Sequence, residues 1–319
     1  MTNPYNAIIG FPNRIDSATL SGGAWADSLP LAHLKDRMLS RVARTANTDP
    51  AGTWFIIDLG RQRAVRLLAF INHNNSFSGR FRVRGSNSLN FDEVAGPLPT
   101  QQQGKPLDLA WEHPDWWNGI VLEYDVTFDA WPAATSDWNI DELEWEADNY
   151  WVGSFTQEDT EGQTPASIHI LPEGTEARYW RIDLIDPQNQ AGFLEIGRIF
   201  IGDVFLQPRI NMSWGANLAY ETATAIETAL GGAEFFDPRE SLRVMRFQLA
   251  YLSEEEGFAK ALELTRRAGI HLEVLFIGDP TDRTYGSQRN FLGRLRTLNP
   301  LEQAMFQLTS MAFEIKELR

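Results

Sequence analysis

At 319 residues the chain is long enough for two domains that each bury a substantial core. It carries 28 Lys and Arg residues against 43 Asp and Glu residues, a formal net charge of −15, and such an acidic chain is repelled by phosphate backbones, so nucleic acid is not an expected partner. The chain has no cysteine, which excludes disulfides and thiol chemistry and indicates a fold completed in a reducing cytoplasm.

The N-terminal part shows few signals of regular structure. Its first residues are not a basic stretch followed by an apolar one, so we expect no secretory signal. No apolar run in the chain approaches the roughly 20 residues that cross a bilayer, and we expect a soluble protein without membrane insertion. Residues 1–52 lack periodicity and predict an irregular lead-in, in which residues 29–42 could hold a short helix.

The first predicted strand is residues 53–60, with the sequence TWFIIDLG. Large apolar groups occupy both faces of this short β-branched run, which a glycine ends, and this pattern is typical of a strand buried between two layers. A polar turn, residues 61–63, separates it from a second apolar strand, residues 64–71. Further strands are predicted at residues 80–85, 119–126, 139–146, 150–156, 167–171, 177–184 and 195–202, with a long loop at residues 96–118.

Four of these segments follow one another in a recurring order. They are residues 54–60, which end in Asp-Leu-Gly, residues 81–86 followed by Phe91, residues 177–182 and residues 195–202. This set resembles the discoidin, or coagulation factor 5/8 type C, family of galactose-binding-like domains. The resemblance covers roughly residues 40–205 and implies a jelly-roll β-sandwich. It says little about a ligand.

The texture of the sequence changes near Pro208, and we place a domain boundary there. Ser253 and Glu256 have the spacing of a capping box, which predicts a helix that ends at Gly269. Residues 214–236 fit no single pattern, and residues 242–252 fit a strand better than a helix. Strands are predicted at residues 270–277, 291–298 and 304–318, the last two joined at Asn299 and Pro300.

The motif Arg-x-Phe-Leu-Gly at residues 289–293 and the ending Phe-Glu-Ile-Lys-Glu-Leu at residues 313–318 accompany this strand-helix-strand unit. Together they resemble tail-tube and distal-tail proteins of long-tailed bacteriophages, although in the distal-tail proteins the ring domain precedes the jelly roll. The resemblance implies a homo-oligomeric ring, a hexamer or a trimer, with tail-tube and hub proteins as partners. It implies a place in the virion, at a tail tip or baseplate assembled in the bacterial host cytoplasm.

The predicted fold class is therefore mainly β. A galactose-binding-like jelly-roll β-sandwich, residues 1–205, precedes a smaller α+β assembly domain, residues 206–319.

No set of residues predicts catalysis, a metal site or a cofactor site. The five histidines are scattered without ligand spacing, and no phosphate-cradling glycine motif or GxSxG motif occurs. We expect His271 to be a packed residue at the start of a strand. Carboxylates are abundant, but solvated strand faces explain them better than a glycosidase does. The chain is not expected to be an enzyme.

The eleven tryptophans divide into two groups. Trp54 and Trp180 lie in apolar strands and are expected in the core, and the Asp58 carboxylate is expected to cap backbone donors of the following turn. Loop aromatic residues either pack onto the sandwich or contact a glycan or a protein, and the sequence leaves both open. The candidate contact residues are His73, Asn74, Asn75, Trp111, Trp116, Trp117, Trp131 and Trp138.

The leading functional hypothesis is a non-catalytic structural component of a phage tail tip or baseplate. Its C-terminal domain would bind neighbouring subunits and its jelly roll would project outward. The alternative is a carbohydrate-binding module for adhesion, with a host-surface glycan as its partner.

Overall fold

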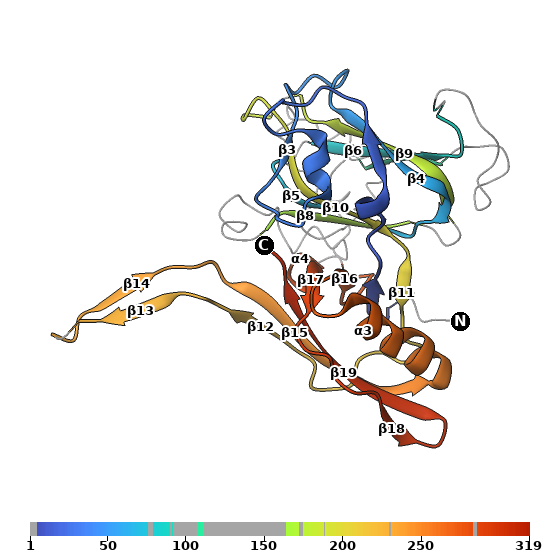
Figure 1. The fold of residues 1–319 in the computed structure, drawn as a ribbon, viewed down its shortest axis with the longest axis vertical. Helices are drawn as coiled ribbons and strands as arrows, with labels where there is room; N and C mark the ends of the chain where they lie inside the picture. The colour runs from blue at the N-terminus through green and yellow to red at the C-terminus, as the bar shows by residue number, and fades with distance from the viewer. Residues whose placement is uncertain are drawn as a thin grey trace, which may run out of the picture.

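The computed structural model describes residues 5–75, 79–89, 91, 107–111, 164–171, 175–187, 189–229, 231–282 and 286–319. This part of the chain is mainly β. Three antiparallel sheets lie in layers, and one helix packs on the outer side of the third sheet (Figure 1).

The first sheet has five strands, in the order β2-β4-β9-β6-β7. The alternation predicted for its central strand is present, because Phe55 and Ile57 are fully buried and Asp58 lies on the opposite face. The strands are β2 (Thr19–Ser21), β4 (Trp54–Ala64), β9 (Glu176–Ile185), β6 (Arg80–Ser86) and β7 (Leu107–Trp111).

The second sheet has four strands and packs face to face with the first. The Phe70 ring of this sheet stacks on the Phe81 ring of the first, with ring centroids 4.3 Å apart, and Trp180 is fully buried in the same core. The two sheets form the expected jelly-roll-like sandwich. The strands are β3 (Ala43–Arg44), β10 (Glu195–Gly202), β5 (Leu67–His73) and β8 (Ala166–Ile170).

The third sheet has eight strands, in the order β11-β1-β16-β17-β19-β15-β12, and β18 pairs with β19 beside this path. Its strands are β1 (Ile8–Gly10), β11 (Val204–Leu206), β12 (Asn217–Glu221), β15 (Leu242–Ser253), β16 (Glu273–Ile277), β17 (Phe291–Leu295), β18 (Glu302–Met305) and β19 (Leu308–Glu317). The short helices are η1 (Arg14–Ser17), η2 (Leu31–Lys35) and α4 (Gly286–Arg289).

Both faces of the third sheet are covered. On one face, the side chains of Phe247, Phe276 and Phe313 pack with the long helix, whose segments are η5 (Glu255–Leu262) and α3 (Glu263–Ala268). On the other face, Leu275 and Ile277 meet apolar side chains of β5, β8 and β10. The sandwich and the third sheet thus share an apolar interface.

The long helix begins where its capping box was predicted. The backbone amide of Glu256 donates to Ser253 Oγ over 3.2 Å, and the amide of Ser253 donates to Glu256 Oε2 over 2.9 Å. At the other end Gly269 adopts φ 54°, a conformation that costs a glycine little. The helix has the predicted position and the predicted end.

Several other predictions need correction. Residues 1–52 contain β1, which pairs with β11 and β16 inside the third sheet, because its three buried residues complete that sheet's core. Residues 61–63 continue β4 through an irregular register instead of forming a turn. The loop predicted at residues 96–118 contains β7, and the strand predicted at residues 304–318 is a hairpin of β18 and β19. The boundary at residue 205 stays a prediction.

Two single-residue predictions are also wrong. Trp54 lies on the outer face of its sheet, because Phe55 and Ile57 take the inward positions of the alternation. His271 precedes β16 and is exposed, so it is not a packed strand residue.

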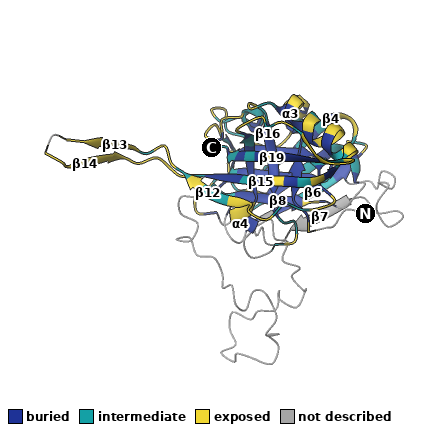
Figure 2. Cartoon of the chain, turned by 90° about the horizontal axis from the view of Figure 1, so that it is seen from below, coloured by how far each residue is buried: buried dark blue, intermediate teal, exposed yellow. Residues whose placement is uncertain are grey.

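The ambiguous residues 214–236 form most of a β-arm, which we define as residues 222–241. Within it, β13 (Ala225–Thr228) pairs with β14 (Glu234–Asp237). The arm continues the ribbon of β12 and β15 away from the third sheet, and every residue of β13 and β14 is exposed (Figures 1 and 2).

Candidate functional site

The predicted contact residues at the end of β5 lie in the interior. His73 and Asn75 are buried. The Asn74 side chain bridges two backbone groups, since its amide donates to the Phe193 carbonyl over 3.0 Å and its oxygen accepts from the Glu195 amide over 2.7 Å. The Asn74 bonds stabilise the sandwich, and the burial of His73 and Asn75 does not fit the exposed glycan contact that their sequence suggests.

His73 belongs to a buried pair with His169. Burial lowers the pKa of His73 to about 3, and burial together with the nearby His73 lowers the pKa of His169 to about 3. The Ser167 hydroxyl lies 2.6 Å from His169 Nε2. Both imidazoles are therefore neutral at ordinary pH.

Of the five candidate tryptophans, the structure describes only Trp111. Trp111 is the last residue of β7, where its backbone is paired with that of Phe81. Trp116, Trp117, Trp131 and Trp138 lie outside the described residues, as does the acidic stretch of residues 158–161. Their roles as glycan or protein contacts stay predictions.

The outer face of the five-stranded sheet carries aromatic and charged groups side by side. The Arg181 guanidinium lies 4.5 Å from the centroid of the Trp54 ring, and Arg181 Nε pairs with Asp183 over 2.9 Å. Asp58 accepts two hydrogen bonds from Arg178, at 2.9 and 3.0 Å, and one from the Gly60 amide at 2.7 Å. The Arg178 hydrogen bonds hold the pKa of Asp58 below its usual value.

This face presents paired guanidinium, indole and carboxylate groups. Planar guanidinium and indole groups bind polar or anionic partners by stacking and paired hydrogen bonds. The Asp58 carboxylate caps the Gly60 amide, as expected, but its second function is the ion pair with Arg178. Trp180, by contrast, belongs wholly to the core.

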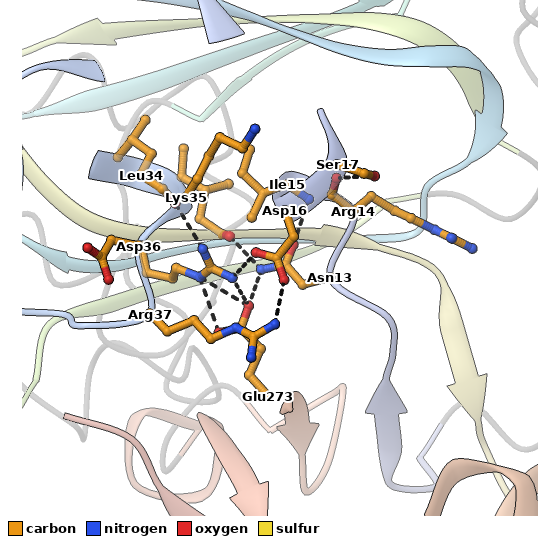
Figure 3. Close-up of polar contacts among 12 residues, drawn as sticks. Asn13, Arg14, Ile15, Asp16, Ser17, Leu34, Lys35, Asp36, Arg37 and Glu273 are labelled. Atoms are coloured by element: carbon orange, nitrogen blue, oxygen red, sulfur yellow. Dashed lines mark hydrogen bonds and ion pairs between the residues drawn. The ribbon is translucent and has the colours of Figure 1, made fainter. Parts of the chain in front are cut away.

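A buried ion pair joins the sandwich to the third sheet. Arg198 of β10 is fully buried and makes hydrogen bonds with Glu273 of β16, at 3.1 Å from Nε to each carboxylate oxygen. Asn13 also donates to Glu273, and Arg198 Nη2 reaches Asp16 over 2.5 Å. Figure 3 shows Asn13, Asp16 and Glu273 converging on one centre.

The acidic groups at this centre stabilise the charged form of Arg198. Burial acts to lower the pKa of Arg198, but the hydrogen bonds and charges of Glu273 and Asp16 outweigh it, so that the pKa of Arg198 is raised. The centre therefore holds two layers of the molecule in one arrangement.

The root of the β-arm is fixed by a second set of ion pairs. Glu221, the last residue of β12, pairs with Arg246 over 3.0 Å, with Lys316 over 3.3 Å and with Arg296. The hydrogen bond from Arg296 leads the causes that lower the pKa of Glu221. Three cations from β15, β19 and the segment after β17 thus hold one carboxylate where the arm leaves the sheet.

Hydroxyl groups continue this restraint into the arm. Thr222 Oγ1 donates to the Arg239 carbonyl over 3.0 Å, and Thr224 Oγ1 accepts from the Arg239 amide over 3.0 Å. The arm is held in a defined direction at its root, although nothing among the described residues packs on β13 or β14.

Three apolar side chains of the arm face solvent. Ile226 is 60% exposed, Phe235 is 64% exposed and Phe236 is 59% exposed. Ile226 and Phe236 are register partners and share one face, whereas Phe235 lies on the other face beside Glu227. The arm is the candidate functional site, a preformed ribbon with apolar groups on both faces.

Sequence reasoning missed this site. The signal available was the Gly231-Gly232 pair between two short segments of β-forming residues, which is a hairpin pattern. The run Glu-Phe-Phe-Asp at residues 234–237 has no polar alternation that would show which face is buried.

Two other kinds of site are absent from the part of the chain that the structure describes. That part of the chain contains no group of three or more His, Asp or Glu side chains placed to hold a metal ion. None of its helices combines the length and the apolar character needed to span a bilayer.

No protein-family model and no curated protein matches the chain. Among solved structures it is similar to a family 89 glycoside hydrolase from Clostridium perfringens, with 13% identity and a TM-score of 0.33 over 61% of this chain and 15% of that one. It is also similar to the lectin-binding domain of Lectinolysin complexed with Lewis b, with 11% identity and a TM-score of 0.33 over 60% of this chain and 96% of that one.

A third similar structure is the family 32 CBM from C. perfringens NanJ in complex with galactose. Its identity to this chain is 11% and its TM-score is 0.32, over 62% of this chain and 99% of that one. The sandwich itself is defined by the strands and pairings of this chain.

Proposed function

We propose that the chain is a non-catalytic structural subunit that assembles with other subunits through the part built on the third sheet. The observation that carries this proposal is the β-arm. A two-stranded ribbon without a packed face is marginal in water, and exposed aromatic groups on both faces favour burial against another molecule. The restraints at Glu221 and Thr222 direct the arm outward, as an assembly element requires.

The particle we propose is the tail tip or baseplate of a long-tailed bacteriophage. The resemblance of residues 289–293 and 313–318 to tail proteins supports this choice. The proposal places the chain in the virion, with tail-tube and hub proteins as partners and a ring of identical copies as its own assembly. The jelly roll would then project from that ring.

The test is the molar mass in solution. Size-exclusion chromatography with light scattering is expected to show a concentration-dependent oligomer. The proposal is overturned by a protein that stays monomeric and also fails to join the products of neighbouring tail genes when these are produced together.

The second candidate is a carbohydrate-binding module for adhesion. The observation that favours it is the outer face of the five-stranded sheet, where Trp54 and Arg181 stack and Tyr179 lies near. Aromatic faces beside hydrogen-bonding groups suit sugar rings. A glycan array followed by titration tests it: saturable binding that weakens in Trp54→Ala places the site on this face, and binding that weakens in Trp116→Ala and Trp117→Ala places it on the loops.

A further inference from the structure

The β-arm carries a net negative charge as well as exposed apolar side chains. Residues 222–241 contain four acidic side chains, Glu227, Glu234, Asp237 and Glu240, and one basic side chain, Arg239. Arg239 is paired with Asp237 over 2.8 Å, so its positive charge is balanced by a carboxylate within the arm. Two arms that met face to face would bring like charges together, which disfavours a symmetric arm-to-arm contact. A basic surface with apolar groups fits the arm better.

The chain itself carries such a surface beside the edge of the third sheet that β11 forms. We define the basic patch as Arg14, Arg61, Arg63 and Arg267. Burial and the positive charges of Arg63, Arg267 and Arg61 together lower the pKa of Arg14, because all three charges act on Arg14. Among the described residues, none of the four takes part in an ion pair, and Asp203 is the acidic group whose charge opposes theirs at Arg14.

The basic patch borders aromatic side chains. The Arg267 guanidinium lies 5.2 Å from the ring centroid of Phe11 and 5.6 Å from that of Phe205, and Lys260 Nζ lies 5.6 Å from the Phe205 ring. Phe258, on the same helix, is 58% exposed. Phe11 is buried and Phe205 is half-buried, and cations beside Phe205, with the exposed Phe258 on the same helix, are the complement of an acidic ribbon that carries Phe235 and Phe236.

The arm leaves the third sheet at one edge, and the basic patch borders the other edge, where Arg267 lies over Phe205. The arm extends from β12, which is one end of the strand order, and Phe205 belongs to β11, which is the other end. One copy can therefore donate its arm and receive another arm at the same time. A contact between two different surfaces of identical chains is heterologous and generates a ring or a filament.

We propose that the β-arm of one copy docks on the basic patch of the next copy, by charge complementarity and burial of the arm's aromatic side chains. This inference rests on the proposed assembly function and specifies the two surfaces that meet. Because the contact depends on exposed charges, assembly weakens as salt is added.

A charge exchange tests the inference. The arm variant carries Glu227→Lys and Glu234→Lys, and the patch variant carries Arg61→Glu, Arg63→Glu and Arg267→Glu; the five positions are exposed or half-buried, and circular dichroism checks the fold. Each variant alone repels its own copies and is expected to lose self-association by roughly tenfold or more. An equimolar mixture restores it, because each variant's arm then meets a patch of opposite charge. A control variant, Asp27→Lys with Glu302→Lys, has the charge change of the arm variant at exposed positions elsewhere and assembles as the wild type does.

Sedimentation velocity across a concentration series separates the outcomes. If the wild type assembles and each variant alone assembles equally well, the inference is overturned, and the proposed function is unaffected. Variants that stay monomeric when mixed also overturn it, since the lost contact is then not between these two surfaces. A wild-type protein that is monomeric throughout overturns it as well, and the proposed function falls only if that protein also fails to join other tail components.

Discussion

The sandwich core and the β-arm are both built from strands with aromatic side chains, but these side chains are buried in the core and exposed in the arm. In the sandwich, Phe55 and Trp180 point between two sheets and are fully buried. In the arm, Phe235 and Phe236 have no second layer and stay exposed. Apolar side chains therefore form a core only where the topology supplies a facing surface. Where it does not, exposed apolar side chains mark a surface that another molecule is expected to cover.

The two sets of ion pairs differ in the same way. Arg198 and Glu273 are buried and join two layers of the molecule. Glu221 and its three cations are partly exposed and orient the arm. Removing a partner from the first set leaves a buried charge, whereas removing one from the second leaves a charge that water can solvate.

The largest effect is expected in the sandwich core. Trp180→Ala removes a fully buried aromatic side chain and should lower the free energy of unfolding by about 3–5 kcal/mol. Urea unfolding followed by circular dichroism measures it. The matched control is Trp54→Ala on the outer face, where loss of the contact with Arg181 should cost about 1 kcal/mol. Equal losses in the two variants would contradict the assignment of their faces.

The interlayer ion pair comes next. Glu273→Ala leaves Arg198 without its main partner, and a loss of about 3–5 kcal/mol is expected because the remaining charge is buried. Glu314 pairs with the partly exposed Arg246 over 2.8 Å, and Glu314→Ala should cost less than about 1 kcal/mol. If the Glu273 variant is as stable as the Glu314 variant, the centre does not hold the layers together.

The buried histidines predict a pH dependence. Because the pKa of His73 and that of His169 are about 3 in the folded protein, the unfolded chain binds more protons below about pH 6.5. The free energy of unfolding should therefore be highest above pH 6.5 and fall toward pH 3, by up to about 1.4 kcal/mol per pH unit for each histidine.

Urea unfolding of wild type and of His169→Asn between about pH 6 and pH 4.5, above the usual carboxylate range, checks this. The variant should show a shallower slope. His271→Asn, at an exposed position, is the control and should keep the wild-type slope. A wild-type slope in His169→Asn would show that this histidine does not titrate on unfolding.

A smaller effect is expected at the helix start. Ser253→Ala removes the hydroxyl that accepts from the Glu256 amide and should cost about 1 kcal/mol. Ser40→Ala, at an exposed position outside any helix or strand, should change the stability little. An unchanged melting temperature in Ser253→Ala would mean that the helix does not depend on its cap.

The parts of this fold that were predictable from sequence are those with local signals. The strand at Phe55 and Ile57 and the capping box at Ser253 have periodicity or capping that acts within a few residues, and β15 was predicted from its place before the capped helix. Trp54 was misplaced because a strand with apolar groups on both faces does not reveal which face is inward. Strand β1 was missed because its partners lie about 200 and 270 residues away.

The candidate site was harder to predict for a physical reason. The arm has no buried face, and so its sequence carries no alternation to detect. The His73 and Asn74 positions looked like a loop, but long-range hydrogen bonds with residues 193–195 draw Asn74 into the fold. Both cases depend on contacts distant in sequence.

Shortening the β-arm is expected to change assembly without changing stability, unlike the substitutions above. Residues 226–236 can be replaced by Asn-Gly, a two-residue turn that closes the Ala225–Asp237 register pair. Since β13 and β14 contact no other layer among the described residues, the melting temperature should not change, whereas the concentration-dependent oligomer seen by light scattering should be lost. An arm-shortened protein that keeps the wild-type melting temperature and the wild-type molar mass at every concentration would contradict the claim that the arm is the assembly element.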